Sequence, residues 1–125
     1  MSDYNPETPP RRGIARVLKA FVHSWRGLRH AFRHEAAIRQ ESAVLCGGVV
    51  LVWLLQVPAL EAGLLLASLL LWIVVELLNS AIEAVVDRIG LEYHPLSGAA
   101  KDMGSAAVLI CGIAVGLLWS VVLLF

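Results

Sequence analysis

One segment of the sequence places ionisable side chains inside a run that is otherwise apolar. Residues 62–75 carry no charge, and the segment 76–87 follows directly. At about 100° per residue, the polar members of this segment share one helix face, in a stripe roughly 100° wide. They are Glu76, Asn79, Ser80, Glu83 and Asp87. Because an ionisable side chain at membrane depth costs roughly 2.5 kcal/mol or more, three carboxylates on one face predict a shared polar site.

The composition is that of a membrane protein rather than of a soluble domain. Hydrophobic residues make up 58% of the 125 residues, a length that suits one domain with a few membrane spans. Cys46 and Cys111 lie in apolar runs and are interpreted as buried thiols, not as a disulfide or a metal pair. The net charge is zero, but most cations precede the first apolar run. They are Arg11, Arg12, Arg16, Lys19, Arg26, Arg29, Arg33 and Arg39.

The pattern of apolar residues predicts an all-α integral membrane protein with one interfacial helix and three transmembrane helices. Residues 1–12 are expected to form a disordered tail, followed by a single domain over 13–125. Apolar residues at spacings of three and four, with cations between them, predict an amphipathic helix over 13–34, which is expected to continue unbroken to 41. The predicted spans are 42–57, 60–87 and 105–125, and a loop over 88–104 connects the last two.

The basic amino-terminal arm sets the expected orientation. The positive-inside rule places this arm in the cytoplasm, so the 88–104 loop lies at the same face and the 56–61 turn lies outside. Glu76 then lies about 10 Å deeper than Glu83, at 1.5 Å per residue. Charges that are scattered in the sequence converge on the cytoplasmic level: Glu35, Glu83, Asp87, Glu92, Lys101 and Asp102.

This set of side chains suits phosphoryl transfer. Mg²⁺ is typically held by one or two protein carboxylates plus phosphate oxygens, and Lys101 would neutralise phosphate charge. The deeper Glu76 is a plausible general base for a hydroxyl presented from the membrane. Together these parts describe transfer from a nucleotide to a lipid alcohol. The glycines near Lys101, in GAAKDMG, do not match a Walker A loop, and spacing alone leaves a proton- or cation-coupled carrier open.

Three segments closely resemble the prokaryotic membrane diacylglycerol kinase family. They read SWRGLRHAFRHEAAIRQE (24–41), VELLNSAIEAVVDRIG (75–90) and EYHPLSGAAKDMGSAAVLI (92–110), and the resemblance covers residues 13–125. The pattern ExxNxAIExxxD followed by KDxxSAAV is highly specific. The resemblance implies a homotrimer in the bacterial inner (cytoplasmic) membrane that uses MgATP to phosphorylate diacylglycerol to phosphatidate. It also implies an active site that faces the cytoplasm and no nucleic-acid partner.

The resemblance also implies roles for individual residues. Glu76 matches the catalytic base, and Glu35 and Glu83 match the carboxylates that hold Mg²⁺ and its nucleotide. The other positions that match nucleotide contacts are Arg16, His23, Glu92, His94, Lys101 and Asp102, with His23 standing where the best-known members have a tyrosine. The positions expected to contact the lipid substrate are Arg16, Trp25, Glu41, Glu76, Asn79 and Ser105.

Each position also has a structural explanation that involves no chemistry. Glu76 could be a buried acid that locks the spans together, Asn79 could hydrogen-bond between helices, and Glu83 could lie in solvent at the interface. Lys101 and Asp102 could cap the third span. Among functions, the alternatives are a kinase for a polyprenol such as undecaprenol, a small proton-coupled carrier and a structural adaptor.

Overall fold

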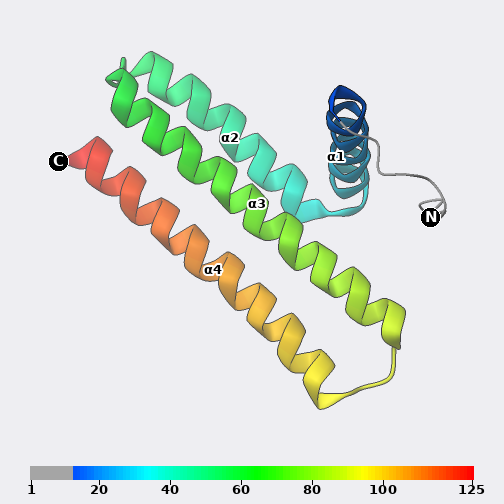
Figure 1. The fold of residues 1–125 in the computed structure, drawn as a ribbon. Helices are drawn as coiled ribbons and strands as arrows, with labels where there is room; N and C mark the ends of the chain where they lie inside the picture. The colour runs from blue at the N-terminus through cyan, green and yellow to red at the C-terminus, as the bar shows by residue number, and fades with distance from the viewer. Residues whose placement is uncertain (1–12) are drawn as a thin grey trace.

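Every regular element of the computed structural model, which describes residues 13–125, is a helix (Figure 1). The helices are α1 (Ile14–His34), α2 (Ala36–Leu54), α3 (Ala59–Ile89) and α4 (Pro95–Leu124). α3 lies between α2 and α4 and packs most extensively against α4. α2, α3 and α4 are each long and apolar enough to cross a membrane, so the predicted class is confirmed. The tail expected over 1–12 lies outside the described residues.

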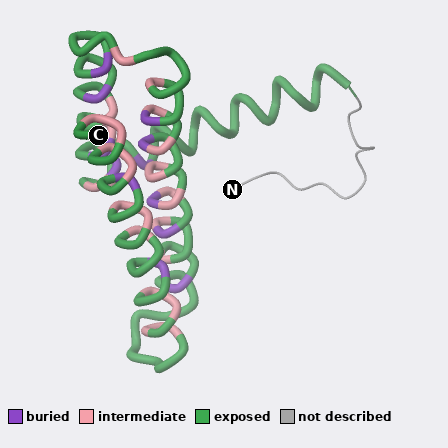
Figure 2. The backbone as a smooth tube through the Cα atoms, turned by 90° about the vertical axis from the view of Figure 1, so that its left-hand side faces the viewer, coloured by how far each residue is buried: buried purple, intermediate pink, exposed green. Residues whose placement is uncertain are grey.

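α1 is oriented crosswise to the three long helices and projects away from them to one side (Figures 1 and 2). Its main contacts are with α2, and Ala31 near its carboxyl end is its one buried residue. The apolar stripe is therefore exposed in the single chain, as Phe21 shows with 72% of its surface accessible. An amphipathic helix with cations on its polar face and an unpaired apolar face is suited to the plane of a membrane interface.

The chain breaks its helix at Glu35, so the prediction of an unbroken helix to residue 41 is wrong. Glu35 has an extended backbone (φ −105°, ψ 116°), and α2 starts at Ala36 rather than at 42. Arg39 reaches back, and its Nη1 donates to the carbonyls of Phe32 at 3.0 Å and Arg33 at 3.2 Å. These bonds satisfy carbonyls that the end of α1 leaves free, which offsets the cost of the break.

The connection between α3 and α4 is much shorter than the predicted loop over 88–104. α3 extends to Ile89 and α4 begins at Pro95. Proline suits a first helical turn because its missing N–H would have no partner there. His94 caps the helix, with Nδ1 accepting from the backbone N–H of Leu96 at 3.2 Å. Capping by Lys101 and Asp102 is therefore wrong, since both lie inside α4.

The three long helices lock together in the half of the bundle away from the acidic residues. Trp119 of α4 donates from Nε1 to the carbonyl of Leu65 at 3.2 Å and to Oγ of Ser68 at 3.3 Å. Leu65 is fully buried. A Cβ at Gly48 of α2 would lie 2.7 Å from Cδ1 of Leu69 and 2.9 Å from the Trp119 ring. Glycine at 48 therefore allows α2 to approach α3 and α4 closely.

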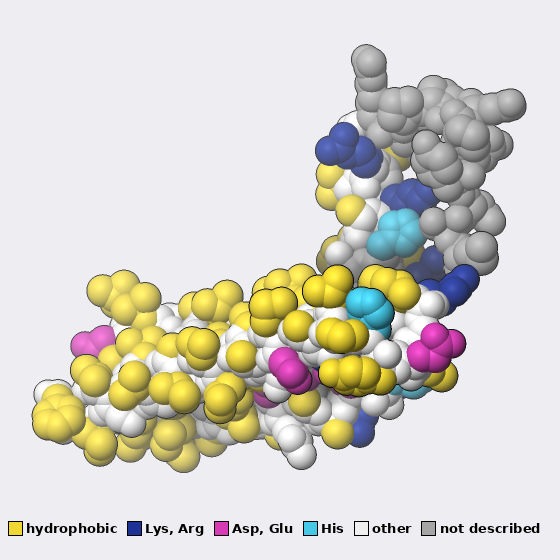
Figure 3. Space-filling view, turned by 90° about the horizontal axis from the view of Figure 1, so that it is seen from below, with side chains coloured by type: hydrophobic (Ala, Val, Ile, Leu, Met, Phe, Trp, Pro, Cys, Tyr) yellow, Lys and Arg dark blue, Asp and Glu magenta, His cyan; other side chains and the backbone are white. Residues whose placement is uncertain are grey.

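The outside of the bundle is apolar. Figure 3 shows hydrophobic side chains over most of the visible bundle surface, with Lys and Arg mostly around α1. Figure 2 places the buried residues on the inner sides of α2, α3 and α4. Large side chains such as Leu70 (52% accessible) and Val85 (61%) face outward. Such a surface is stable against lipid chains and would aggregate in water.

Candidate active site

The polar stripe of α3 goes from buried to exposed along the helix. Glu76 and Asn79 keep 7% and 8% of their surface accessible, Ser80 and Glu83 are half-buried, and Asp87 is exposed. This order follows from the packing, because the carboxyl-terminal part of α3, which ends at Ile89, extends beyond the start of α2 (Figure 1). One end of the stripe thus has a buried carboxylate, Glu76, and the other end has an exposed one, Asp87.

Asn79 connects the two inner carboxylate positions. Its Nδ2 donates to Oε1 of Glu83, one turn further along α3, at 3.2 Å. Its Oδ1 is buried, lies against the backbone of Gly104 in α4 and has no donor among the described residues. The amide therefore does not join α3 to α4 by a hydrogen bond, as its structural explanation requires. It instead orients Glu83.

Four carboxylates from α2, α3 and the break between α1 and α2 act on one another. The negative charges of Glu83 and Glu35 repel that of Glu76, and the charge of Glu76 repels that of Glu41. Glu41 is buried, and its Oε2 has no hydrogen-bond partner in the described chain. Within residues 13–125, no hydrogen bond joins Glu76 to another helix. A buried acid that locks spans together would need such a bond.

Repulsion among these carboxylates would favour a bound cation. Among the described residues, no three His, Cys, Asp or Glu side chains gather closely enough to hold a metal ion by themselves. Glu35, at the break between α1 and α2, and Glu83 of α3 carry hard oxygen ligands, and Asn79 orients Glu83. One or two carboxylates completed by phosphate oxygens are the usual protein contribution to a Mg²⁺ site, so the donor set fits that ion.

A groove between α3 and α4 opens beside Glu76. It has a volume of about 550 Å³, and most of its surface is apolar. It is lined by Trp72, Glu76, Asn79, Ser105, Val108, Leu109, Gly112 and Ile113. Three residues predicted to contact the lipid therefore share this groove with apolar side chains at membrane depth. Such a groove would admit a molecule with a hydroxyl head and a hydrocarbon body.

Lys101 lies at the exposed end of the stripe. Its Nζ contacts Oδ1 of Asp87 at 2.6 Å, and Glu83 also acts on it electrostatically. The two side chains of the ion pair are 40% and 50% accessible, so the pair is open to solvent. Asp102 and Glu92 are exposed near the same end of the α3–α4 hairpin. This end therefore presents both charges to any ligand that approaches from solvent.

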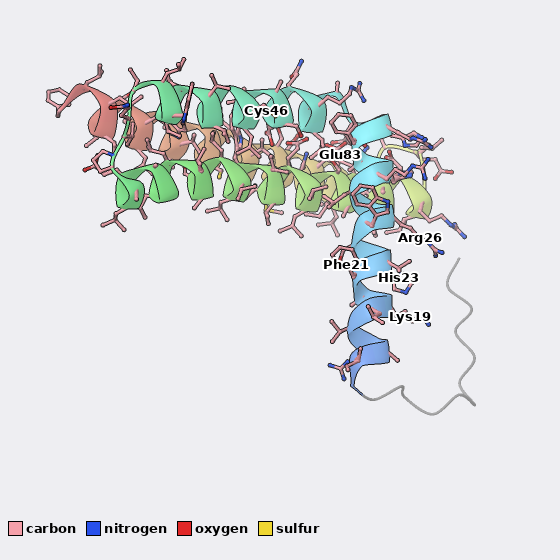
Figure 4. All side chains as sticks on the ribbon, turned by 90° about the horizontal axis from the view of Figure 1, so that it is seen from above. Lys19, Phe21, His23, Arg26, Cys46 and Glu83 are labelled. Carbon is pink, nitrogen blue, oxygen red and sulfur yellow. The ribbon has the colours of Figure 1, made fainter. Side chains whose placement is uncertain are left out.

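A single chain does not bring every predicted site residue together. Arg16 and His23 are exposed on α1, and Figure 4 shows Lys19, His23 and Arg26 along the free length of that helix, away from Glu83. Trp25 lines a second groove of about 360 Å³, with Phe32, Ile38 and Ile73 among its neighbours. The expected lipid contacts Trp25 and Ser105 thus belong to different grooves within one chain.

Trp72 is among the groove residues that the sequence did not predict. Trp72 stands four positions before Glu76, so it shares the helix face of the acidic stripe, and its ring packs against Gly112 of α4. The spacing from Glu76 was a usable signal. A tryptophan inside an apolar run is nevertheless indistinguishable from a lipid-facing side chain until the neighbouring helix is placed.

Comparison with known proteins decides the family. The family model described as prokaryotic diacylglycerol kinase matches residues 22–123. The chain is 54% identical over 111 residues to a diacylglycerol kinase of Escherichia coli strain K12, covering 89% of this chain and 91% of that protein. The chain belongs to the prokaryotic diacylglycerol kinase family.

Other relatives support the same assignment. Diacylglycerol kinases of Haemophilus influenzae and Helicobacter pylori strain 26695 are 43% and 45% identical over 113 and 120 residues. The matches cover 90% and 95% of this chain, and 96% and 92% of those proteins. Membership in the diacylglycerol kinase family confirms the predicted family and the predicted class of enzyme, a kinase.

Proposed function

We propose that this protein transfers the γ-phosphoryl group of ATP to the hydroxyl of diacylglycerol, forming phosphatidate, at the site around Glu76. The observation that carries the proposal is the meeting of a buried carboxylate with an apolar groove between two membrane helices. A soluble alcohol would not need a site at this depth, whereas a lipid alcohol reaches it from the bilayer. The relatives named diacylglycerol kinase support this acceptor.

Glu76 acts as the general base in this proposal. The lipid enters the groove laterally, and its hydroxyl donates a hydrogen bond to the Glu76 carboxylate beside Ser105. As the hydroxyl oxygen attacks the γ-phosphorus in line, its proton passes to Glu76 and ADP leaves. Positioning of the two reactants supplies much of the remaining rate enhancement. Phosphatidate then leaves laterally, toward the basic surface of α1.

Glu35 and Glu83 would hold Mg²⁺ between the protein and the nucleotide phosphates. The bound ion supplies charge neutralisation on the phosphate oxygens. Glu83 is held by Asn79, and Glu35 sits at the break between α1 and α2, where its backbone is extended. Glu83 lies toward the solvent side of Glu76 along α3, which separates the polar nucleotide from the apolar acceptor.

The nucleotide docks at the exposed end of the α3–α4 hairpin. Lys101 exchanges its contact with Asp87 for a phosphate oxygen, which carries more charge. The remaining proposed contacts are Arg16, His23, Glu92, His94 and Asp102.

A homo-oligomer would complete the site. His23 lies on the free length of α1, away from Glu83 in one chain (Figure 4), and Trp25 and Ser105 line different grooves. A neighbouring subunit can supply the missing side of each groove, with Trp25 and Glu41 near the lipid. We take a trimer, the number that the family resemblance implies. By the positive-inside rule, the cations of α1 support a site at the cytoplasmic face of the bacterial inner membrane.

An assay with labelled ATP and a panel of lipid alcohols tests the proposal. Purified protein in lipid micelles with Mg²⁺ is supplied with diacylglycerol, undecaprenol or no acceptor. The expected result is labelled phosphatidate as the main product, and no label without an acceptor. Preferential labelling of undecaprenol would make the protein a polyprenol kinase. Transport of a solute by reconstituted protein with no ATP consumption would make it a carrier.

A further inference from the structure

Trp72 occupies a place in the groove that the proposed chemistry does not yet use. It lies one turn before Glu76 on α3 and is half-buried. Because α3 enters the bilayer from the other face, Trp72 is about 6 Å deeper than Glu76, at 1.5 Å per residue. It lines the same groove as Glu76, Asn79 and Ser105. An acceptor with its hydroxyl at Glu76 would therefore place its next few atoms beside the indole.

The indole rests on a glycine of the neighbouring helix. A Cβ at Gly112 would lie 3.0 Å from Cζ2 and 3.3 Å from Nε1 of Trp72, which is tighter than an ordinary contact. The nitrogen-bearing edge of the ring thus lies against α4 at a position without a side chain. The absence of a side chain at 112 lets the ring lie this close to α4.

The N–H of Trp72 has no acceptor within residues 13–125. Nε1 is buried, and no described residue takes its hydrogen bond, whereas the N–H of Trp119 has two acceptors in the same bundle. A donor without a partner is unfavourable in an apolar interior and is unusual in native structures. At membrane depth water does not reach it freely, so a polar atom of the groove's ligand is the natural partner.

We propose that Trp72 is a specificity-determining residue whose indole N–H donates a hydrogen bond to an ester carbonyl of the acceptor lipid. The inference rests on the proposed function and deepens it. A diacylglycerol carries two ester carbonyls a few bonds from its free hydroxyl, on the side of the hydrocarbon chains. The single oxygen of a polyprenol is the reacting hydroxyl. Trp72 therefore favours a glyceride ester over a polyprenol, in the way that a buried donor rejects ligands that lack its acceptor.

The test crosses one substitution with one change in the substrate. Trp72→Phe keeps an aromatic ring and removes the N–H, and a 1,2-dialkylglycerol with matched chains keeps the hydroxyl and removes the carbonyls. With diacylglycerol, kcat/KM of the variant should fall about tenfold, the effect of one lost hydrogen bond. With the dialkyl ether, the variant and the unmodified protein should agree within about twofold. An equal loss on both lipids, or no loss on either, overturns the proposal.

Two further variants of this protein serve as controls for the Trp72→Phe result. Trp53→Phe removes an N–H from an exposed tryptophan near the other end of α2 and should change neither rate. Replacement of Trp72 by 3-benzothienylalanine retains the bicyclic shape without the N–H. It should show the same loss with diacylglycerol alone, even if the smaller ring of phenylalanine disturbs folding in Trp72→Phe. Failure of the proposed function would look different, because the unmodified protein would then phosphorylate neither glycerol lipid.

Discussion

Asn79 donates from Nδ2 to Oε1 of Glu83 at 3.2 Å, and this one bond joins the buried part of the acidic stripe to its solvent side. The donor belongs to a side chain that is 8% accessible, whereas Glu83 is half-buried. An amide that cannot turn freely therefore holds a carboxylate that faces the proposed metal. Residues that orient a metal-coordinating side chain in this way commonly matter to metal affinity nearly as much as that side chain does.

A double-mutant cycle on Asn79 and Glu83 tests this relationship. Asn79→Leu and Glu83→Gln should each raise the Mg²⁺ concentration that gives half-maximal activity, by about tenfold or more. The double variant should be little worse than Glu83→Gln alone, because the amide acts through the carboxylate. Titration of activity with Mg²⁺ measures this. Ser80→Ala, on the same helix face, is the control. Unchanged Mg²⁺ dependence in Glu83→Gln would remove this residue from the metal site.

Glu76→Gln should abolish turnover while leaving nucleotide binding nearly unchanged. The amide has a similar shape and cannot accept the proton of the lipid hydroxyl, so kcat should fall by about 10²–10⁴-fold. Steady-state kinetics and equilibrium binding of ATP separate the two effects. Glu61→Gln, in the first turn of α3 at the far end of the helix, should behave as the unmodified protein. Near-normal turnover in Glu76→Gln would be incompatible with a role as the base.

Gly104→Ala should reduce activity through Asn79. A methyl group at 104 would overlap Oδ1 of Asn79, so the amide must turn and release Glu83. We expect a loss of about 1–3 kcal/mol in the free energy of unfolding, and a higher Mg²⁺ concentration for half-maximal activity, as for Asn79→Leu. Gly47→Ala is the matched control, because nothing lies within 4 Å of a Cβ there. In that helix interior alanine should stabilise by about 0.5–1 kcal/mol. Thermal unfolding in detergent, together with the kinase assay, checks both variants.

The ion pair between Lys101 and Asp87 should matter more to nucleotide binding than to stability. Both side chains are accessible, so solvent screens the pair, and Asp87→Asn should barely change the melting temperature. Lys101→Met should raise KM for ATP about tenfold, since it removes a charged donor to phosphate. If Lys101→Met instead lowers the melting temperature and leaves KM unchanged, the lysine is structural.

Trp119→Phe should weaken the fold without altering the chemistry. The substitution removes the N–H that reaches Leu65 and Ser68, at a cost of about 1 kcal/mol in the free energy of unfolding. These residues lie in the half of the bundle away from Glu76, so kcat per folded protein should be unchanged. Chemical unfolding followed by fluorescence, with kinetics on the folded fraction, distinguishes stability from activity. A fall in kcat equal to that of Glu76→Gln would contradict this separation.

The features that sequence could predict are those set by local periodicity. The apolar length of α3 and its polar stripe repeat at the helical spacing, so their existence follows without knowledge of any neighbour. The break at Glu35 did not follow, because no glycine or proline marks it and Arg39 stabilises it through carbonyls of the preceding helix. The start of α4 at Pro95 was missed because glycines at 98 and 104 are also typical of a loop, and the cap comes from His94.

By itself, the sequence determined that this protein is helical, that three helices belong in a bilayer, and that one of them carries acids on a single face. Only the tertiary structure decided that Glu76 borders a groove with Trp72 and Ser105, and that α1, the helix that contains Arg16, projects away from the bundle. The reason is that periodicity acts over one or two turns of a single helix. Which side chains meet across α3 and α4 depends instead on how closely the backbones pack, and this is set by glycines such as Gly104 and Gly112.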